Sequence, residues 1–488
     1  MSALPAIGDD VMNLISGSWE AAASERWNRR YDPANQQVLV ARAPDSSRDD
    51  ARRAIEAAAD AGPAWRQWTA PKRGRLLFDW LNWIDSNRAA LAELLTREEG
   101  KTRVESAGEV ARAIDVLEYT AGMGRRLGGK VFSAEDSSVF CYSSRHPLGV
   151  VGLISPWNFP VAIPVWKIAP ALIAGNTVVL KPSPLTPLTA VALVRGLESV
   201  GLPAGVVNLV HGDSEPGIEM TSNSAVNGLS FTGSTKVGKL IARAASERLL
   251  KVQLELGGKN PQIVLEDADL DMALAGVIAG AFGSTGQRCT ATSRAIILDG
   301  VYQKFVARLV EQANQLIVGP GVQPGVQMGP LVTGNALDCV TAYTGAAKNE
   351  GAEFLAGGDR LRDSTREHGF FFAPTVVEAE PEMAVAMEEV FGPVLSVIRA
   401  RDFEHAMEIA NTVRYGLTAS IFTRDVNRAL SFADRIEAGM VHVNRPGVGG
   451  YSHAPFGGIK DSGYGGREVG DEVMNFYTEP KVVYVNYE

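Results

Sequence analysis

The chain has 488 residues, 45% of them hydrophobic and 21% charged, so we expect a globular protein with more than one hydrophobic core. Its formal net charge of −9 argues against nucleic acid or an anionic membrane as a partner, and no apolar run approaches the roughly 20 residues of a membrane helix. Because the three cysteines are far apart and the six histidines are scattered, we expect no disulfide framework, no metal ion and a cytoplasmic location.

The first 123 residues are predicted to be mostly helical after a short β-rich start. The first ten residues carry neither the positive flank nor the apolar run of a signal peptide. Turn residues interrupt short strands between residues 13 and 40, and the acidic and serine residues at 45–50 are typical of a helix start. Helical patterns then run to residue 61 and over 71–84, 91–99 and 104–123. We interpret these helices as a covering layer that by itself indicates no chemistry.

Two β-rich stretches lie far apart in the sequence. Residues 128–146 change to a strand-like pattern, and the C-terminal residues 481–487 have a similar composition. The two stretches either pair into a projecting arm, whose exposed edges would join subunits, or add an edge to the main sheet. The strand pattern alone leaves both arrangements open.

From residue 149 onward the chain alternates short apolar runs with helical stretches. The runs at 150–154, 177–180 and 206–210 are rich in valine and leucine, and helical patterns separate them. Such runs indicate a parallel sheet with crossover helices, which binds its ligands at the carboxyl ends of the strands. The residues that follow each strand are therefore the candidates for a functional site.

Polar residues follow three of these strands. Asn158 lies between two prolines after Ile154, so a stiff loop holds its amide ready to donate to an oxyanion, although an isolated asparagine is more often a turn residue. Lys181 ends the next strand, where it either meets a ribose or phosphate or remains a solvated charge. The Gly/Ser turn at 232–238 precedes a helix expected over 239–245 and forms a potential anion site, but it matches neither GxGxxG nor a P-loop.

Two further residues have the chemistry of a reacting centre. Glu255 lies in a strand between two leucines, where desolvation would raise its pKa and suit a general base, with a buried, paired structural glutamate as the alternative. Cys289 follows a turn at Gly286 and lies beside Arg288. A cationic neighbour stabilises a thiolate, so we predict a nucleophile, although free cysteines are usually buried apolar residues.

A second α/β alternation begins at residue 295 and indicates a second domain. A helix is predicted over 302–316, and the alternation continues over 411–423 and 439–444. A glycine-rich loop near the end holds the aromatic Phe456. The alternation therefore predicts an α/β fold with two open parallel-sheet domains, to which the family resemblance given next adds a small β arm.

Six ordered motifs make the chain resemble the aldehyde dehydrogenase superfamily of NAD(P)-dependent enzymes over nearly its whole length. One motif would be weak, but the ordered set is specific. The resemblance implies a Rossmann-like cofactor domain over residues 1–123 and 147–256, a catalytic domain over 257–466, and an oligomerisation arm over 124–146 and 467–488. The motifs are Pro156-Trp-Asn-Phe-Pro160, Phe231-Thr-Gly-Ser234, Leu254-Glu-Leu-Gly-Gly-Lys259, Gly286-Gln-Arg-Cys289, Glu389-Val-Phe-Gly-Pro393 and Pro455-Phe-Gly-Gly458.

The family's chemistry agrees with the interpretation of the individual residues. The resemblance implies that the Cys289 thiolate attacks an aldehyde to give a thiohemiacetal, whose oxyanion the Asn158 amide and the Cys289 backbone N–H hold. Hydride transfer to the nicotinamide leaves a thioester, which water activated by Glu255 hydrolyses to a carboxylic acid. The implied partners are a small-molecule aldehyde and further copies of the chain, as a homodimer or a homotetramer.

The resemblance also implies a binding site for NADP or NAD. Lys181 and the Gly233–Ser234 turn would hold the adenosine ribose and the pyrophosphate, and Glu389 would hold the nicotinamide-side ribose. The expected cofactor-binding residues are Ile154, Trp157, Lys181, Ser183, Gly233, Ser234, Leu256, Glu389 and Phe391.

Two positions depart from the family's pattern. Many NAD-specific members carry a glutamate where this chain has Pro184, and that carboxylate chelates the adenosine ribose hydroxyls. Because Pro184 removes a charge that would repel a 2′-phosphate while Lys181 and Ser183 stay available, we hypothesise that NADP is accepted, or even preferred. Gly283 replaces a second aromatic residue, which predicts a roomier substrate tunnel.

The substrate is the most open part of the prediction. Arg288 either tunes Cys289 and supports structure, or binds a substrate carboxylate with its forked guanidinium. The sequence around Cys289 is similar to that of members that oxidise semialdehyde acids, notably 2-oxoglutarate semialdehyde. Phe159, Trp166 and Phe456 would suit aromatic or medium aliphatic aldehydes equally well.

Two alternatives to simple aldehyde oxidation are acyl transfer to coenzyme A and a non-catalytic role. Glu255 argues against the first, and the intact Cys, Glu and Asn set argues against the second.

Overall fold

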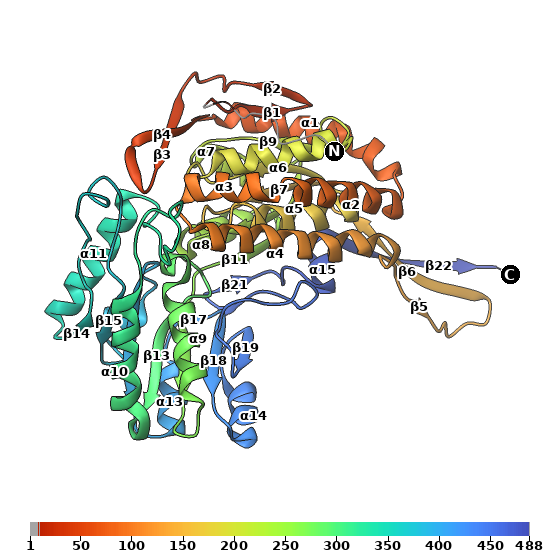
Figure 1. The fold of residues 1–488 in the computed structure, drawn as a ribbon. Coiled ribbons are helices and arrows are strands. Elements are labelled where there is room, and N and C mark those ends of the chain that lie inside the picture. Colours follow the sequence, from red (N-terminus) through yellow and green to blue (C-terminus); the bar gives the residue numbers. More distant parts are fainter. Residues whose placement is uncertain (1–7, 9, 488) are drawn as a thin grey trace.

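The computed structural model describes residue 8 and residues 10–487, and it shows an α/β fold built around two large, mostly parallel sheets (Figure 1). Residues 1–7, on which the expectation of no signal peptide chiefly rests, lie outside the described residues. Among the helices that the structure describes, none has both the length and the apolar composition needed to cross a membrane.

The first sheet has the strand order β2-β1-β9-β8-β7-β10-β11-β21. Its five central strands, β7 to β11, are parallel, and the edge strands β1, β2 and β21 join through antiparallel pairing. This confirms the parallel sheet predicted from the apolar runs. The strands are β1 (Asn13–Ile15), β2 (Ser18–Glu20), β7 (Val150–Ile154), β8 (Thr177–Lys181), β9 (Val207–Leu209), β10 (Val226–Thr232), β11 (Lys251–Glu255) and β21 (Gly463–Tyr464).

Helices cover both faces of this sheet because its strands are apolar on both sides. Val151 and Leu153 of β7 pack into one hydrophobic core with α2 to α6 and α15, whereas Val150 and Ile154 pack into another with α1, α7 and α8. The helices are α1 (Arg48–Gln67), α2 (Ala70–Ser86), α3 (Arg88–Glu99), α4 (Arg103–Gly122), α5 (Ala162–Ala174), α6 (Pro187–Ser199), α7 (Glu215–Ser222), α8 (Thr235–Ser246) and α15 (Met474–Tyr477).

The second sheet repeats this layered plan with the order β14-β15-β16-β13-β12-β18-β19. All its pairs are parallel except β14 with β15. Helices α9 and α10 cover one face, and α11 to α14 cover the other. The strands are β12 (Asn260–Val264), β13 (Thr292–Leu298), β14 (Glu353–Ala356), β15 (Thr375–Glu378), β16 (Val394–Ala400), β18 (Thr418–Phe422) and β19 (Met440–Val443); the helices are α9 (Leu270–Phe282), α10 (Asp299–Gln315), α11 (Gly334–Asn349), α12 (Ala384–Met387), α13 (Phe403–Asn411) and α14 (Val426–Arg435).

The two separated β-rich stretches pair with each other. Strand β6 (Val139–Pro147) runs antiparallel to β22 (Thr478–Asn486) along its whole length, and β5 (Val131–Phe132) pairs with the other side of β6. These strands form their own three-stranded sheet, which projects from the body of the protein (Figure 1). The projecting arm is therefore correct, and the alternative of an extra edge on the main sheet is wrong.

Two small two-stranded sheets and three short 3₁₀ turns complete the described elements. Strands β3 (Trp27–Asp32) and β4 (Asn35–Pro44) pair near the N-terminus, and β17 (Tyr415–Gly416) pairs with β20 (Ile459–Lys460). The turns are η1 (Met123–Arg125), η2 (Gly283–Gly286) and η3 (Asp471–Val473).

Candidate active site

Cys289 lies just after a tightly wound turn between α9 and β13. Ser284, Thr285 and Gly286 all have positive φ, and a Cβ on Gly286 would collide with the Gly392 carbonyl, so only glycine fits there. The turn predicted at Gly286 is thus confirmed. The Asn260 amide donates hydrogen bonds of 2.8 Å to the carbonyls of Cys289 and Ala291, which fixes the backbone that carries the sulfur.

Cys289 lines a cavity of about 280 Å³ between residues of the two large sheets. This cavity brings together residues that are distant in sequence, and most of them are predicted site residues. The rings of Trp157 and Phe391 meet edge to face in its wall, with centroids 5.5 Å apart. The lining residues are Pro156, Trp157, Asn158, Thr232, Gly233, Ser234, Leu256, Gly257, Cys289, Glu389 and Phe391.

The Asn158 amide is held close to the cysteine loop. Its Nδ2 donates a 3.0 Å hydrogen bond to the carbonyl of Gln287, two residues before Cys289. Gln287 is itself fixed because its Oε1 accepts from the Val332 N–H at 2.9 Å. A side-chain amide has two N–H donors. One of them anchors Asn158, and the other is available for an oxygen bound at Cys289.

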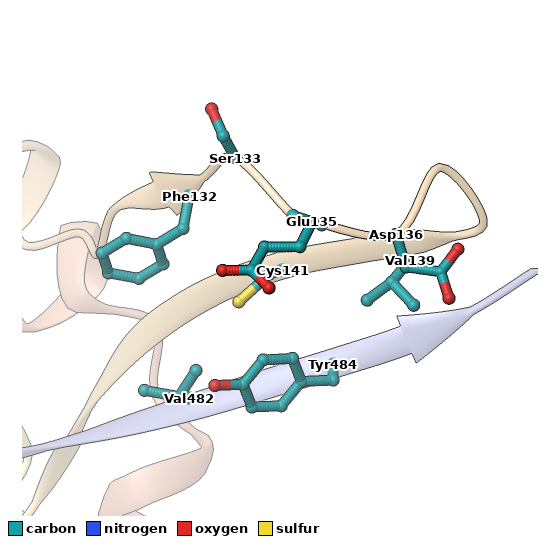
Figure 2. Close-up of a pocket in the computed structure, with 9 residues that line it drawn as sticks. Phe132, Ser133, Glu135, Asp136, Val139, Cys141, Val482 and Tyr484 are labelled. Carbon is teal, nitrogen blue, oxygen red and sulfur yellow. The ribbon is translucent and has the colours of Figure 1, made fainter.

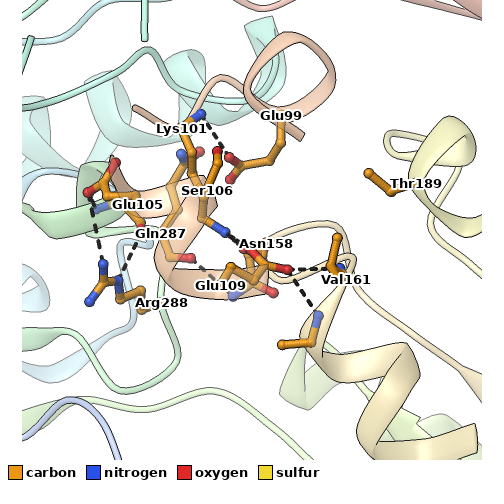
Figure 3. Close-up of polar contacts among 12 residues, drawn as sticks. Glu99, Lys101, Glu105, Ser106, Glu109, Asn158, Val161, Thr189, Gln287 and Arg288 are labelled. Carbon is orange, nitrogen blue, oxygen red and sulfur yellow. Dashed lines mark hydrogen bonds and ion pairs between the residues drawn. The ribbon is translucent and has the colours of Figure 1, made fainter. Parts of the chain in front are cut away.

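A buried polar network from α4 supports the Asn158 loop (Figure 3). The Lys101 ammonium donates to the Asn158 carbonyl and forms an ion pair with Glu109 at 2.7 Å. Glu109 in turn accepts from the backbone N–H groups of Val161 and Ala162 at 2.8 and 3.1 Å, at the start of α5.

Helix α4, interpreted from the sequence as part of a covering layer, therefore also supports the candidate site. Lys101 and Glu109 were missed because each lies more than 45 residues from Asn158 in sequence, and only the packing of α4 against α5 brings them there. The local sequence did contain one indication that Glu109 has a special role. Glu109, Ala113 and Val116 occupy one buried helix face at i, i+4 and i+7, and an unpaired charge on such a face is rare.

Glu255 ends β11 and is almost completely buried, with 2% of its surface exposed. Burial raises the pKa of its carboxyl well above the usual value, and the neighbouring Glu468 raises the pKa further, while Lys167 opposes both. Lys167 is paired with Glu468 and also donates to Ser230 Oγ at 2.7 Å. The desolvation predicted for Glu255 is therefore confirmed, and the raised pKa makes its carboxylate a stronger base than that of an ordinary glutamate.

Arg288 has contacts that fit one of its predicted roles, that of a residue held in the structure. Burial raises the pKa of the Cys289 thiol to about 12, and the carboxylates of Glu389 and Glu255 also raise it. The Arg288 guanidinium donates to Ser284 Oγ at 3.0 Å and faces Glu105 at 3.9 Å (Figure 3). Arg288 interacts electrostatically with Cys289, but the pKa of the thiol is still raised, because burial and the surrounding carboxylates outweigh this interaction.

The space expected beside Gly283 is also filled. A Cβ on Gly283 would lie only 3.2 to 3.5 Å from the guanidinium atoms of Arg288. The prediction of a roomier tunnel at this position is therefore wrong. The Arg288 guanidinium occupies the space beside Gly283.

The cavity has the features that a dinucleotide needs. Ser234 caps the N-terminus of α8, which begins four residues earlier than predicted, so free backbone N–H groups face the turn at Gly233. Glu389 lies so close to Gly257 that a Cβ there would collide with its carboxylate, and it accepts from the Gly258 N–H at 3.0 Å. Burial raises the pKa of Glu389 to about 7. An anion site and a carboxylate in the wall of one cavity fit a pyrophosphate and a ribose.

The remaining predicted cofactor residues lie outside this cavity, at the ends of β7 and β8. Ile154 is the register partner of Lys181, and both face Gly217 of α7. Lys181 is buried, donates to the Pro182 carbonyl at 3.3 Å, and has its pKa lowered by burial to about 8. Ser183 Oγ accepts from the Leu185 N–H at 3.2 Å.

The three aromatic residues predicted for the substrate side share one cluster. Phe159 and Phe456 pack against a small core that contains Trp166, Ile163, Val116 and Val469. The Trp166 and Phe456 rings are tilted by 36° with centroids 5.5 Å apart. The Phe159 ring also lies under the Lys101 ammonium, at 3.9 Å from its centroid. The cluster therefore extends from the residue after Asn158 to the C-terminal glycine-rich loop.

Comparisons with known proteins agree over nearly the whole chain. Residues 19–483 match the model of the Aldehyde dehydrogenase family. The alpha-ketoglutaric semialdehyde dehydrogenase of Bacillus subtilis is 44% identical over 476 residues, which cover 97% of this chain and 98% of that protein. A betaine aldehyde dehydrogenase from Staphylococcus aureus, solved in complex with NAD+, is 34% identical with a TM-score of 0.96 and coverage of 99% and 96%. A solved E. coli NADP dependent enzyme is 36% identical, with a TM-score of 0.94 and 98% of both chains covered.

Proposed function

This chain belongs to the aldehyde dehydrogenase family, and from that premise we propose that it oxidises a semialdehyde acid such as 2-oxoglutarate semialdehyde. Oxidation of an aldehyde with NAD or NADP is the activity of the family. The proposed substrate rests on the name of the Bacillus subtilis relative, which is 44% identical to this chain. The proposed reaction rests on membership of the family.

We propose that Cys289, Asn158 and Glu255 carry out the chemistry. Bound NAD(P) supplies the acceptor for the hydride. The Cys289 sulfur attacks the aldehyde carbon, and the Asn158 N–H that is not bonded to Gln287 donates to the oxyanion. After hydride loss, Glu255 takes a proton from the water that hydrolyses the thioester. The raised pKa of Glu255 supports this role, because a strong enough base is needed at neutral pH.

We propose that the dinucleotide is bound between the two sheets. Ser234 and Gly233 at the start of α8 would hold the pyrophosphate, Glu389 the nicotinamide-side ribose, and Lys181 with Ser183 the adenosine ribose. Trp157, Phe391, Leu256 and Ile154 would supply the apolar walls. The corresponding domain limits are residues 1–123 and 147–256 for cofactor binding and 257–466 for catalysis, although β21 of the latter range pairs with β11.

The choice between NADP and NAD gives a first prediction, at Pro184. The variant Pro184→Glu is expected to lower kcat/KM for NADP roughly 10-fold or more, because a carboxylate next to Lys181 and Ser183 repels a 2′-phosphate. The value for NAD should stay the same or rise. Steady-state kinetics with both cofactors measure the ratio, and Pro184→Gln is the matched control without the charge. A wild-type kcat/KM for NAD far above that for NADP would contradict the hypothesis.

The substrate proposal is tested by comparing aldehydes. Wild-type protein is assayed for NAD(P)H formation with 2-oxoglutarate semialdehyde, with benzaldehyde and with pentanal. A clear preference in kcat/KM for the semialdehyde acid supports the proposal. Equal or better oxidation of benzaldehyde or pentanal would instead favour the alternative of an aromatic or medium aliphatic substrate, which the cluster of Phe159, Trp166 and Phe456 suits equally well.

Acyl transfer is a less favoured alternative. Glu255, buried next to a site that would need water, supports hydrolysis over transfer of the acyl group to coenzyme A. Adding coenzyme A to the assay and searching for acyl-CoA by mass spectrometry separates the two. Appearance of the free acid alone is expected.

We further propose that the arm joins subunits of a homodimer or homotetramer in the cytoplasm. Its surface is apolar for an exposed sheet, since Val131 and Tyr484 are each 72% exposed. Phe132, Val482 and Tyr484 surround Cys141 in an open hollow of about 600 Å³ (Figure 2). The three free cysteines support a reducing compartment.

The arm yields a second prediction. The double variant Val482→Asp and Tyr484→Asp places two charges on one face of β22, because alternate residues of a strand share a face. We expect it to shift the protein to smaller species in sedimentation velocity, while Lys481→Asp, on the opposite face, leaves the distribution unchanged. The same sedimentation coefficient for the double variant and the wild type would show that this face is not an interface.

A further inference from the structure

A second cavity of about 300 Å³ opens between α4 and the segment from β19 to Phe456. Two arginines, Arg112 and Arg445, line it together with His442, Tyr451 and Phe456. Among the described residues that line it, none is an aspartate or a glutamate. The chain as a whole has 56 acidic and only 47 basic residues, so a cavity with two guanidinium groups and no carboxylate is locally well suited to an anion.

The cavity adjoins the proposed catalytic residues. Phe456 exchanges two backbone hydrogen bonds with Glu468, at 2.7 and 2.8 Å, and Glu468 is the charged neighbour of Glu255. The next residue, Gly457, lies so close to the Glu255 carboxylate that a Cβ there would collide with it. On its other side the Phe456 ring contacts Trp166 of the aromatic cluster. One aromatic wall therefore separates the cavity from both Glu255 and the Asn158 loop.

Helix α4 directs Arg112 to this cavity. Glu109 accepts from the N–H groups that follow the Asn158 loop, and Val116 belongs to the aromatic cluster. Arg112 lies between them, about 4.5 Å along the helix axis from Glu109 at the usual rise per residue. Its side chain therefore projects from the same side of α4 that supports Asn158, one turn closer to Phe456.

Arg112 also differs from the other cations near the site in having no fixed partner. Arg288 bonds to Ser284 and faces Glu105, and Lys167 and Lys101 are paired with Glu468 and Glu109. Arg112 makes no hydrogen bond or ion pair with any residue in the part of the chain that the structure describes; its nearest charged neighbour is Asp115, on an exposed position of the same helix. Among the described residues, the Arg445 guanidinium donates one hydrogen bond, to the Tyr451 hydroxyl at 3.1 Å, and forms no ion pair.

We propose that Arg112, assisted by Arg445, binds the carboxylate of the semialdehyde substrate, with its aldehyde end directed past Phe456 to Cys289. This inference rests on the proposed function, and it names the residues that would recognise the acid. Removing a charge-assisted hydrogen bond to a substrate costs affinity without touching the reacting atoms. Arg112 is thus a determinant of specificity, and Arg288 supports the cysteine loop.

The test compares a charged and a neutral aldehyde. Arg112→Leu is expected to raise KM for 2-oxoglutarate semialdehyde roughly 10- to 100-fold, and to change KM for pentanal by less than about 3-fold. Glutarate, which has a carboxylate at one end and a second carboxylate in place of the aldehyde, should inhibit the wild type competitively and lose that inhibition in the variant. Arg103→Leu, an exposed arginine on the same helix, is the matched control, and Arg445→Leu and Arg288→Ala are measured beside it.

The outcomes separate this inference from the proposed function. A wild-type enzyme without preference for the semialdehyde acid over pentanal would defeat the proposed function. If the preference exists but Arg112→Leu retains it, or if KM rises equally for pentanal, the inference about Arg112 is overturned. A selective effect at Arg288→Ala alone would move the carboxylate site to Arg288. Should Arg112→Leu fold poorly by thermal denaturation, Arg445→Leu and the wild-type glutarate inhibition decide the question.

Discussion

Cys289→Ser is expected to lower the dehydrogenase kcat to less than about 10⁻⁴ of the wild-type value. The change replaces a sulfur by an oxygen of similar size, so the cavity and its other walls should remain in place. A hydroxyl is a far weaker acid than a thiol, and this site already raises the pKa of the thiol to about 12 through burial and two carboxylates. An alkoxide would therefore be almost absent, and the first covalent step would fail.

The measurement has two parts. NAD(P)H absorbance follows turnover, and a fluorescence titration follows dinucleotide binding, whose Kd should change by less than about 2-fold because no hydrogen bond is removed. Cys339→Ser, at the exposed cysteine of α11, is the matched control and should retain full activity. A Cys289→Ser enzyme that turns over at a tenth of the wild-type rate or faster would show that this cysteine is not the nucleophile.

The sequence alone was sufficient to identify candidate site residues that lie next to the ends of strands. Asn158 and Cys289 lie in short stretches whose turns, prolines and glycines fix the local backbone, and the two residues line one cavity with Glu389 and Gly233. Glu255 was recognisable because a charged residue between leucines at the end of a strand is desolvated wherever the sheet is placed. Local sequence was enough here because the alternation of strands and helices dictates which edge of the sheet these residues share.

The contributions of α4 could not be predicted in the same way. Lys101 and Glu109 reach the Asn158 loop because α4 and the residues just before it pack against α5, and no local pattern specifies which helix covers which part of a sheet. The choice between the predicted roles of Arg288 was left open for a related reason. Adjacency in sequence to Cys289 gives no direction for a long side chain, and the orientation was decided by Ser284 and Glu105.

The elevated pKa values of both reacting groups have a common consequence for pH dependence. Each group is active in its deprotonated form, and burial raises the pKa of each above its usual value. Both contributions to the rate must therefore increase as the pH rises, and neither can produce an acid optimum. The two steps can be separated in time, because acylation at Cys289 precedes hydrolysis assisted by Glu255.

Glu255→Gln is expected to slow hydrolysis of the thioester by roughly 10²- to 10⁴-fold, the usual contribution of a general base. Acylation does not use this carboxyl, so mixing enzyme, NAD(P) and aldehyde should give a burst of NAD(P)H equal to the active subunits, followed by a slow steady state. Intact-protein mass spectrometry should detect the acyl adduct on Cys289. The steady-state rate of the wild type should rise with pH as the Glu255 carboxyl loses its proton, and the variant should lose that rise.

The burst of NAD(P)H distinguishes a Glu255 that assists thioester hydrolysis from a Glu255 that deprotonates the Cys289 thiol. If Glu255 instead deprotonated the thiol, the first turnover itself would be slow, no burst would appear, and no acyl adduct would accumulate. Glu56→Gln, on an exposed position of α1, is the matched control and should leave both phases unchanged. Because Glu255 is held against Gly457 and next to Glu468, glutamine fills the same space, and lost activity then reflects the missing base and not a collapsed site.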